Sequence, residues 1–104
     1  MNDKVLSFLS ICRKAGKCVS GEFSCEKALK EGKAVMLIVA EDASANTKKH
    51  FTDMCTYRNV PIYFHGTKEA LGACLGQNIR AQAAVLDEGF AARLTELLKN
   101  TDQK

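Results

Sequence analysis

The residues with the clearest chemical potential lie in the first third of the chain, where basic side chains surround a Ser-Gly pair. Lys14 and Lys17 precede Ser20 and Gly21, and an amphipathic segment that predicts a helix begins at Glu22. The first turn of a helix has backbone N–H groups without intrahelical partners, and the helix dipole is positive at that end. Both features favour an anion such as a phosphate. The same pattern fits a tight turn beside solubilising lysines, and the residues alone leave both interpretations open.

The helix that begins at Glu22 carries further groups suited to nucleic-acid contact. Lys27 lies one turn after Phe23 and Ser24, so these side chains share a similar face. The Ser24 hydroxyl can donate to a phosphate or to a base edge. Phe23 can stack on an unpaired base or pack into the core, and of the two we expect the core. In the functional interpretation, the N–H groups of Gly21 and Glu22 hold a phosphate.

A second polar loop is expected near the end of the fourth helix. Residues 76–80, GQNIR, combine an amide pair, an apolar tip and a cation. Placed beside the turn at Gly21, this loop forms the second wall of a groove; the alternative is a plain connection between a helix and a strand. The candidate RNA-binding residues are Lys14, Lys17, Gly21, Glu22, Phe23, Ser24, Lys27, Lys30, Lys33, Asn78, Ile79 and Arg80.

Length and composition predict one domain over residues 1–104, since the chain has 104 residues and is 46% hydrophobic. Residues 100–104 are expected to form a polar tail. The net charge of +3 and the pI of about 8.6 permit nucleic-acid binding without requiring it. The longest apolar run, residues 34–40, is far shorter than the roughly 20 residues of a membrane span, and the N-terminus does not resemble a secretory signal. We therefore expect a cytoplasmic protein without a membrane partner.

Cysteine and histidine residues give no sign of a metal site in their spacing. The cysteines are Cys12, Cys18, Cys25, Cys55 and Cys74. Their number is odd and no pair has C-x-x-C spacing, so we expect reduced core residues rather than disulfides or a zinc knuckle. His50 and His65 have no Cys, Asp or Glu partner at ligand spacing, and both are expected to be structural or exposed.

Acidic pairs lie at the ends of two expected strands, Glu41-Asp42 at the end of the central one and Asp87-Glu88 at the end of the last. Paired carboxylates at strand ends can hold a metal ion or perform acid–base chemistry. Each pair also precedes an expected helix, where acidic side chains stabilise the positive end of the dipole, and we favour this capping role. The sequence contains no nucleophile elbow, P-loop or dinucleotide glycine pattern. We therefore expect no catalytic residue, no metal site and no cofactor, so the chain is not expected to be an enzyme.

Helical and strand patterns alternate along the chain. Val5 and Leu9 recur at helical spacing after a cap at Asn2 or Asp3, and residues 35–42 include an apolar run without alternation, which predicts a strand buried on both faces. The expected helices cover about residues 4–14, 22–31, 45–58 (with Ser44 as its cap), 67–76 and 88–99, and the expected strands cover 17–20, 35–42, 62–65 and 83–86. The order predicts an α/β fold, a three-layer α/β/α sandwich with a small mixed four-stranded sheet.

Several longer segments resemble a known family. They are KALKEGKAVMLIVAEDAS from Lys27, NVPIYFHGTKEALGACLG from Asn59 and IRAQAAVLDEGFA from Ile79. Together they resemble the ribosomal protein L7Ae family of kink-turn RNA binders, and RKAGKCVSGE from Arg13 is similar to its small bacterial, YlxQ-like members. The resemblance covers about residues 4–98. The resemblance is specific because three motifs occur together: A-E-D after the central strand, V-P before the next strand and G-T-K-E-x-L-G.

The resemblance implies an α/β/α fold that binds RNA through the loop opening the second helix. The family signature there, Gly-x-Asn-Glu-x-x-Lys, falls on residues 21–27. Gly21 and Lys27 fit, whereas Phe23-Ser24 replaces the Asn-Glu pair that reads guanine edges in the family. Losing that carboxylate lowers base discrimination by about 1–3 kcal/mol. The implied phosphate-binding scaffold is therefore kept, while reduced kink-turn specificity is expected. The family's second RNA-facing loop falls on about residues 77–80.

These observations support a non-catalytic bacterial RNA-binding protein, associated with the ribosome, with ribosomal RNA or translation-associated proteins as partners. The alternative is a protein-interaction module on the same fold, with RNA readout reduced or lost. The departure at Phe23-Ser24 and the modest net charge favour that alternative. A third hypothesis, an enzyme or an enzyme's accessory domain that uses Glu41, Asp42 or a cysteine, ranks last because nothing indicates a second domain.

Overall fold

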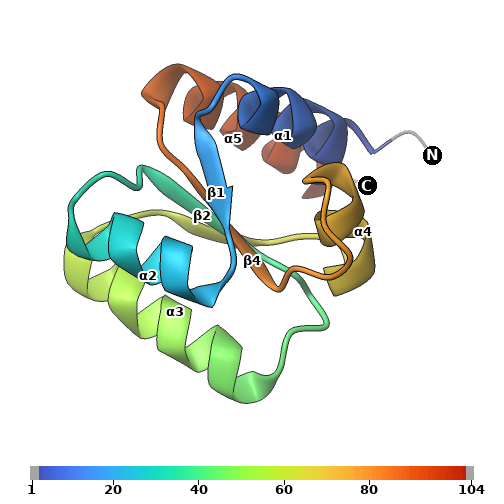
Figure 1. Cartoon of the computed structure of the whole chain (residues 1–104). Coiled ribbons are helices and arrows are strands. Elements are labelled where there is room, and N and C mark those ends of the chain that lie inside the picture. The colour runs from blue at the N-terminus through green and yellow to red at the C-terminus, as the bar shows by residue number, and fades with distance from the viewer. Residues whose placement is uncertain (1–2, 103–104) are drawn as a thin grey trace.

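The computed structural model describes residues 3–102, with side chains described through residue 100. Helices and strands alternate along these residues (Figure 1). The helices are α1 (Lys4–Lys14), α2 (Glu22–Lys30), α3 (Ala45–Arg58), α4 (Lys68–Cys74) and α5 (Glu88–Asp102), and the strands are β1 (Cys18–Ser20), β2 (Met36–Val39), β3 (Ile62–Phe64) and β4 (Gln82–Val85). None of the described helices is long and apolar enough to cross a membrane.

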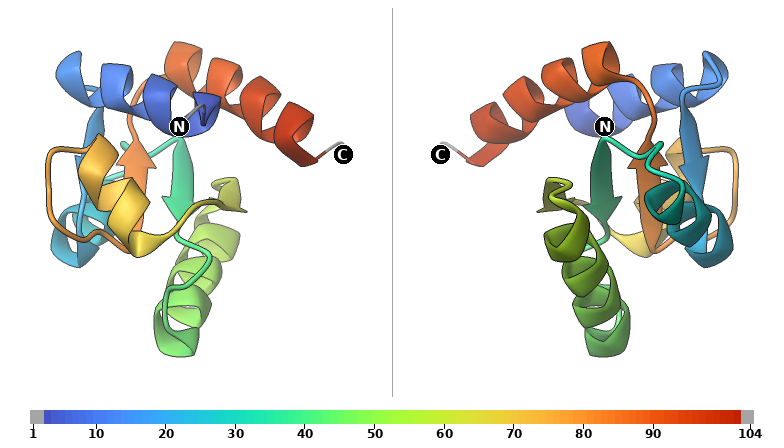
Figure 2. Two further views of the ribbon diagram at one scale, coloured as in Figure 1. Left: turned by 90° about the vertical axis from the view of Figure 1, so that its right-hand side faces the viewer. Right: turned by 90° about the vertical axis from the view of Figure 1, so that its left-hand side faces the viewer.

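The four strands form one mixed sheet in the order β1-β4-β2-β3. Strand β4 runs antiparallel to both β1 and β2, and β3 runs parallel to β2. Ala83 of β4 pairs with Ser20 on one side and with Ile38 on the other. Helices α1, α4 and α5 cover one face of the sheet, and α2 and α3 cover the other (Figures 1 and 2). This architecture confirms the expected three-layer sandwich.

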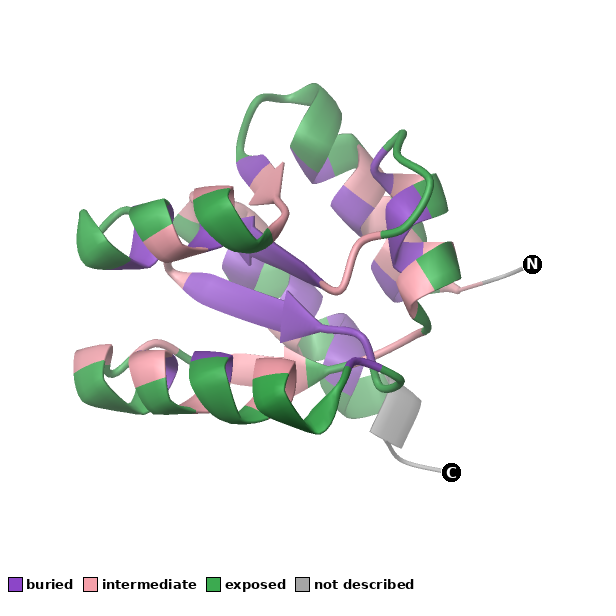
Figure 3. Cartoon of the chain, turned by 60° about the horizontal axis from the view of Figure 1, so that its bottom comes forward, coloured by how far each residue is buried: buried purple, intermediate pink, exposed green. Residues whose placement is uncertain are grey.

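Strand β2 shows how the sequence pattern produces the layers. Met36 and Ile38 pack into the core cluster that includes buried residues of α1, α4 and α5, whereas Leu37 and Val39 pack into the cluster formed with α2 and α3. All of these side chains are buried, and Figure 3 shows the buried sheet between helices whose outer faces are exposed. Successive side chains of a strand point to opposite faces. An apolar run without alternation therefore has both faces covered.

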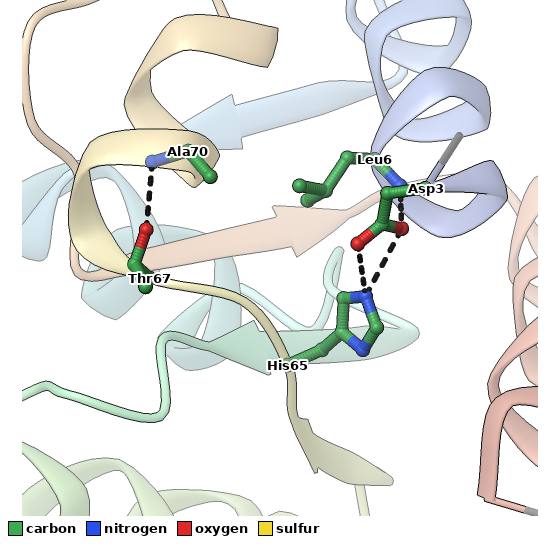
Figure 4. A network of polar contacts seen from close by, with 5 residues as sticks. All are labelled: Asp3, Leu6, His65, Thr67 and Ala70. Atoms are coloured by element: carbon green, nitrogen blue, oxygen red, sulfur yellow. Dashed lines mark hydrogen bonds and ion pairs between the residues drawn. The ribbon is translucent and has the colours of Figure 1, made fainter. Parts of the chain in front are cut away.

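Polar side chains fix the starts of α1 and α4. Asp3 Oδ1 accepts a hydrogen bond from the Leu6 N–H at 3.0 Å, and Thr67 Oγ1 accepts one from the Ala70 N–H at 3.0 Å (Figure 4). His65 Nε2 also lies 2.8 Å from Asp3 Oδ2, which ties the segment after β3 to the start of α1. Caps of this kind each stabilise a helix by about 1 kcal/mol.

The acidic pairs expected to cap helices do so through one carboxylate each. Asp87 Oδ2 accepts a hydrogen bond from the Phe90 N–H at 3.0 Å in the first turn of α5. Asp42 Oδ1 accepts one from the Lys68 N–H at 2.8 Å, so it caps α4 rather than α3, which follows it in sequence. Ser44 caps α3 instead, as expected. The capping interpretation is confirmed for Asp87, whereas for Asp42 the expected helix is wrong, because Asp42 caps α4 and not the helix that follows it.

Helix α5 is longer than its expected extent of 88–99, because it continues to Asp102. The expected polar tail at residues 100–104 is therefore wrong for residues 100–102. Neither glycine nor proline follows Lys99 in the sequence, so no residue type there interrupts the backbone hydrogen bonding of a helix. Residues 103 and 104 lie outside the described residues.

Candidate nucleic-acid interface

Two loops that are distant in sequence meet beside the end of β1. Because β1 pairs with β4, the turn into α2 lies next to the loop that connects α4 to β4. Arg80 Nε donates a hydrogen bond to Ser20 Oγ at 3.0 Å, and Arg80 Nη1 donates to the Ile79 carbonyl at 3.0 Å. The Arg80–Ser20 hydrogen bond joins the two loops, which therefore lie side by side, as expected. We call residues 21–24 together with residues 77–80 the paired-loop surface.

Gly21 occupies the cap position of α2 with a φ of +93°, a conformation that favours glycine. Its N–H donates to the Gln82 carbonyl at 3.2 Å, so the expectation that this N–H holds a phosphate is wrong. The sheet pairing of β1 with β4 continues into the turn and uses the donor. The Cys25 N–H donates to the Gly21 carbonyl at 3.0 Å, which leaves the first-turn N–H groups of residues 22–24 without intrahelical acceptors.

The paired-loop surface exposes one apolar side chain in the first turn of α2 and one on the loop before β4. Phe23 is 78% exposed and Ile79 is 58% exposed. The expectation that Phe23 packs into the core is wrong. Cys25, Ala28 and Leu29 form the buried stripe of α2, and at 100° per residue Phe23 lies about 200° round the helix from Cys25. This spacing is visible in the sequence, and it places Phe23 on the solvent side.

The second loop is folded back onto α4. The Gln77 N–H donates to the Gly72 carbonyl at 2.8 Å, and the Arg80 N–H donates to the Lys68 carbonyl at 3.1 Å. A Cβ atom at Gly72 would lie 2.8 Å from backbone atoms of Ile79, so only glycine fits this approach without a shift. A glycine inside a helical pattern is a sequence signal for such close packing. The backbone that carries Ile79 is therefore fixed by main-chain contacts.

The candidate lysines do not all lie at the paired-loop surface. Lys17 precedes β1 and Gly21 follows it, which separates their Cα atoms by roughly 13 Å along the strand, and Lys14 lies earlier still, at the end of α1. Lys30 ends α2, roughly 12 Å along the helix axis from its first turn, and Lys33 follows it. The fold therefore separates lysines that are close in sequence, and these four lysines lie away from the paired-loop surface.

Two other basic side chains, Lys27 and Arg13, lie on helices that adjoin the paired-loop surface. Lys27 is on the second turn of α2 and is exposed, with its Nζ 4.0 Å from Glu31, a contact of little energetic weight. Arg13, which the candidate set lacks, packs against the start of the second loop: a Cβ atom at Gly76 would lie 3.2 Å from its guanidinium carbon. No local pattern reveals this contact, because it depends on the packing of α1 against α4.

The cysteines are all free thiols, as expected. Burial raises the pKa of Cys25 to about 12 and the pKa values of Cys55 and Cys74 to about 11. Interaction between the neighbouring thiols of Cys12 and Cys18 lowers the pKa of Cys12 and, together with burial, raises the pKa of Cys18. Cys25, Cys55 and Cys74 are therefore protonated at neutral pH, which fits packing residues better than nucleophiles.

The described residues thus define a small α/β/α domain in which a hydrogen bond from Arg80 to Ser20 joins two loops at one end of the sheet. The chain belongs to the ribosomal protein L7Ae/L30e/S12e/Gadd45 family, whose sequence profile matches residues 3–95. This confirms the resemblance read from the sequence. The family is non-catalytic, which agrees with the expectation that the chain is not an enzyme.

Individual relatives match over most of their length. The chain is 39% identical over 90 residues to the RNA-binding protein YlxQ of Bacillus subtilis (strain 168), covering 86% of this chain and 90% of that protein. It is 30% identical over 96 residues to the RNA-binding protein YlxQ of Enterococcus faecium, covering 92% of each. The relatives named here therefore span nearly the whole domain.

Solved structures confirm the fold. A Bacillus halodurans C protein of unknown function superposes with a TM-score of 0.90 at 31% identity, covering 94% of this chain and 99% of that one. The Giardia lamblia 15.5kD RNA binding protein superposes with a TM-score of 0.76 at 21% identity, covering 96% of this chain and 89% of that one. At that identity the second likeness concerns the fold alone.

Proposed function

We propose that the chain binds structured RNA without catalysing a reaction, and that the paired-loop surface receives the RNA. The observation that carries the proposal is the exposure of Phe23, in the first turn of α2, and of Ile79, on the loop before β4, two segments that the Arg80–Ser20 hydrogen bond joins. Exposed apolar side chains on two adjacent segments suit an unstacked base, and the first-turn N–H groups of α2 suit backbone phosphates. The relatives named as RNA-binding proteins, at 39% and 30% identity, support the same function.

The RNA that fits this surface best is kinked and carries unpaired nucleotides. Phe23-Ser24 offers an aromatic face and a hydroxyl in place of a carboxylate. Stacking on an aromatic ring tolerates any base, because every base has a π-face. Recognition would then depend on the bend and on the unpaired nucleotides more than on guanine edges. We place this activity in the cytoplasm, with ribosomal RNA and the ribosome as the first partners to test.

A comparison of three RNAs tests the proposal by fluorescence anisotropy at fixed salt. The first is a kink-turn with a bulge and tandem G·A pairs, the second keeps the bulge but replaces the G·A pairs, and the third is a straight duplex of equal length. We expect the two bulged RNAs to bind with affinities within about tenfold of each other, since the lost guanine contacts are worth little here. The straight duplex should bind more weakly than both. Equal binding of all three, or no binding, would refute the proposal.

A protein partner is the second candidate, because exposed Phe23 and Ile79 also suit an apolar contact. Affinity capture from a bacterial extract, with and without nuclease, separates the two candidates. RNA binding predicts enriched RNA, and co-captured proteins that are lost after nuclease treatment. Proteins retained after nuclease treatment, without any enriched RNA, would replace the RNA proposal with a protein-interaction function.

A further inference from the structure

A cluster of potential metal ligands lies where α2 meets α3. Glu22 and Glu26 are four residues apart on α2, so their side chains lie on one face of the helix. His50 of α3 joins them from 24 residues further along the chain. One ligand atom from each of these side chains lies within 4.8 Å of the others. Sequence spacing gives no sign of this group, because the fold alone brings the histidine to the carboxylates.

The imidazole is already directed at the carboxylates. His50 Nε2 lies 2.6 Å from Glu26 Oε2. The His50 ring also stacks edge-on against the Phe51 ring, with centroids 4.9 Å apart and an interplanar angle of 74°. Phe51 is fully buried, in the same core cluster as Cys25 and Leu29 of α2. The packed core therefore sets the separation of the two helices, and the aromatic contact limits the orientation of the ligand ring.

The donor set indicates a class of metal. One imidazole with two carboxylates suits borderline first-row ions such as Zn²⁺ and Co²⁺, whereas Mg²⁺ and Ca²⁺ prefer oxygen ligands alone. We propose that Glu22, Glu26 and His50 bind one divalent transition-metal ion on the outer edge of the α2–α3 interface. The ion would take the place of the contact between His50 Nε2 and Glu26 Oε2, and three protein ligands would leave a coordination position open. This proposal departs from the expectation, made from sequence spacing, that the chain has no metal site.

The site would also change the charge at the first turn of α2. Glu22 and Glu26 are two acidic groups on one helix face, and Glu22 itself belongs to the paired-loop surface. A bound divalent cation neutralises both carboxylates. It also links α2 to α3 through side chains, in addition to the apolar contacts beneath, so metal binding should raise the thermal unfolding midpoint.

Cobalt titration of the folded, metal-free protein tests the site, because Co²⁺ reports its ligands by visible absorption. We expect one saturable equivalent without the thiolate-to-cobalt charge-transfer band that the free cysteines would give. Zn²⁺ should displace the cobalt, whereas Mg²⁺ and Ca²⁺ should not. Glu26→Gln and His50→Ala should each weaken binding by at least about tenfold and abolish the rise in the unfolding midpoint.

Glu31→Gln is the matched control, since Glu31 is an exposed glutamate directly after α2 that does not belong to the cluster. This variant should bind cobalt like the wild type. Circular dichroism confirms that each variant is folded before titration, and Glu22→Gln provides a further ligand variant. Absence of a saturable equivalent, a thiolate band, wild-type binding by the Glu26 or His50 variant, or an equal loss in Glu31→Gln would each overturn the proposal.

Discussion

Arg80 and Ser20 are joined by a hydrogen bond of 3.0 Å although they are 60 residues apart in the sequence. Ser20 ends β1 and Arg80 closes the loop before β4, so this contact fixes the distance between the two halves of the paired-loop surface. It also holds the guanidinium beside Gly21, where a Cβ atom would lie 3.8 Å from Arg80 Nε. A positive charge is thereby held next to the first turn of α2.

Replacement of Arg80 by alanine should weaken RNA binding by about 1–3 kcal/mol, because it removes the hydrogen bond to Ser20 and a cation that we propose contacts a phosphate. Ser20→Ala removes only the hydrogen bond and should cost less, about 0.5–1.5 kcal/mol. Arg93→Ala is the control, since Arg93 lies on α5 and pairs there with Glu96. Binding titrations on all of these variants check the order. Equal affinities of Arg80→Ala and Arg93→Ala would contradict the assignment.

Lys27 should contribute to RNA binding through charge alone. Its exposed ion pair with Glu31, at 4.0 Å, holds it weakly, so it is available to a phosphate. Lys27→Ala should reduce affinity across RNA sequences and lower the slope of log K against log salt by about one unit. Lys49→Ala removes an exposed lysine of α3 that pairs with Asp53 at 2.9 Å, and it should leave the slope unchanged. An unchanged slope in Lys27→Ala removes this residue from the interface.

Gly72→Ala should displace the second loop, because the new methyl group would meet the loop backbone. The added Cβ would lie 2.8 Å from backbone atoms of Ile79, which cannot yield as a flexible side chain does. We expect a loss of about 1–3 kcal/mol in the free energy of unfolding, measured by urea denaturation, together with weaker RNA binding. Gly89→Ala adds a methyl group that meets only the Asp87 carboxylate, at 3.1 Å, and should cost less. Similar losses in both variants would argue against a fixed loop.

The buried thiols should make the protein less stable at alkaline pH. Burial raises the pKa of Cys25 from 9.0 to about 12 and that of Cys55 to about 11. Above a pH of about 9 the unfolded chain loses these thiol protons while the folded chain retains them, so the free energy of unfolding falls as pH rises. The decline measured in urea between neutral and alkaline pH should be smaller in a Cys25→Ala, Cys55→Ala double variant. Identical declines would show that these thiols do not contribute.

Much of the fold could be predicted because its signals are local. The unbroken apolar run around Ile38 identified a strand covered on both faces, and Ser44 marked the start of α3. The position of Phe23 was also available from the spacing of the buried stripe of α2, although the residue type favoured the core. The aromatic residue type predicted a buried side chain and the helical period predicted an exposed one, and the structure agrees with the period.

The features that local patterns missed all depend on contacts across the fold. The Gly21 N–H is occupied by Gln82 of the neighbouring strand, which no turn pattern shows. His50 meets Glu26 only because α2 and α3 share a core. Basic residues that are close in sequence, such as Lys17 and Lys27, are separated by β1 and the first turn of α2. Sequence proximity therefore overestimated the size of the positive surface.

The RNA affinity of Phe23→Ala, measured beside that of Tyr57→Ala, tests the paired-loop surface most directly. Phe23 is 78% exposed in the first turn of α2 and Tyr57 is 81% exposed near the end of α3, so the two variants remove similar aromatic area from different helices. Phe23→Ala should lose about 1–3 kcal/mol of binding to a bulged RNA, because a stacked base loses its aromatic partner, whereas Tyr57→Ala should bind like the wild type. Wild-type affinity in Phe23→Ala, or equal losses in both variants, would contradict the account.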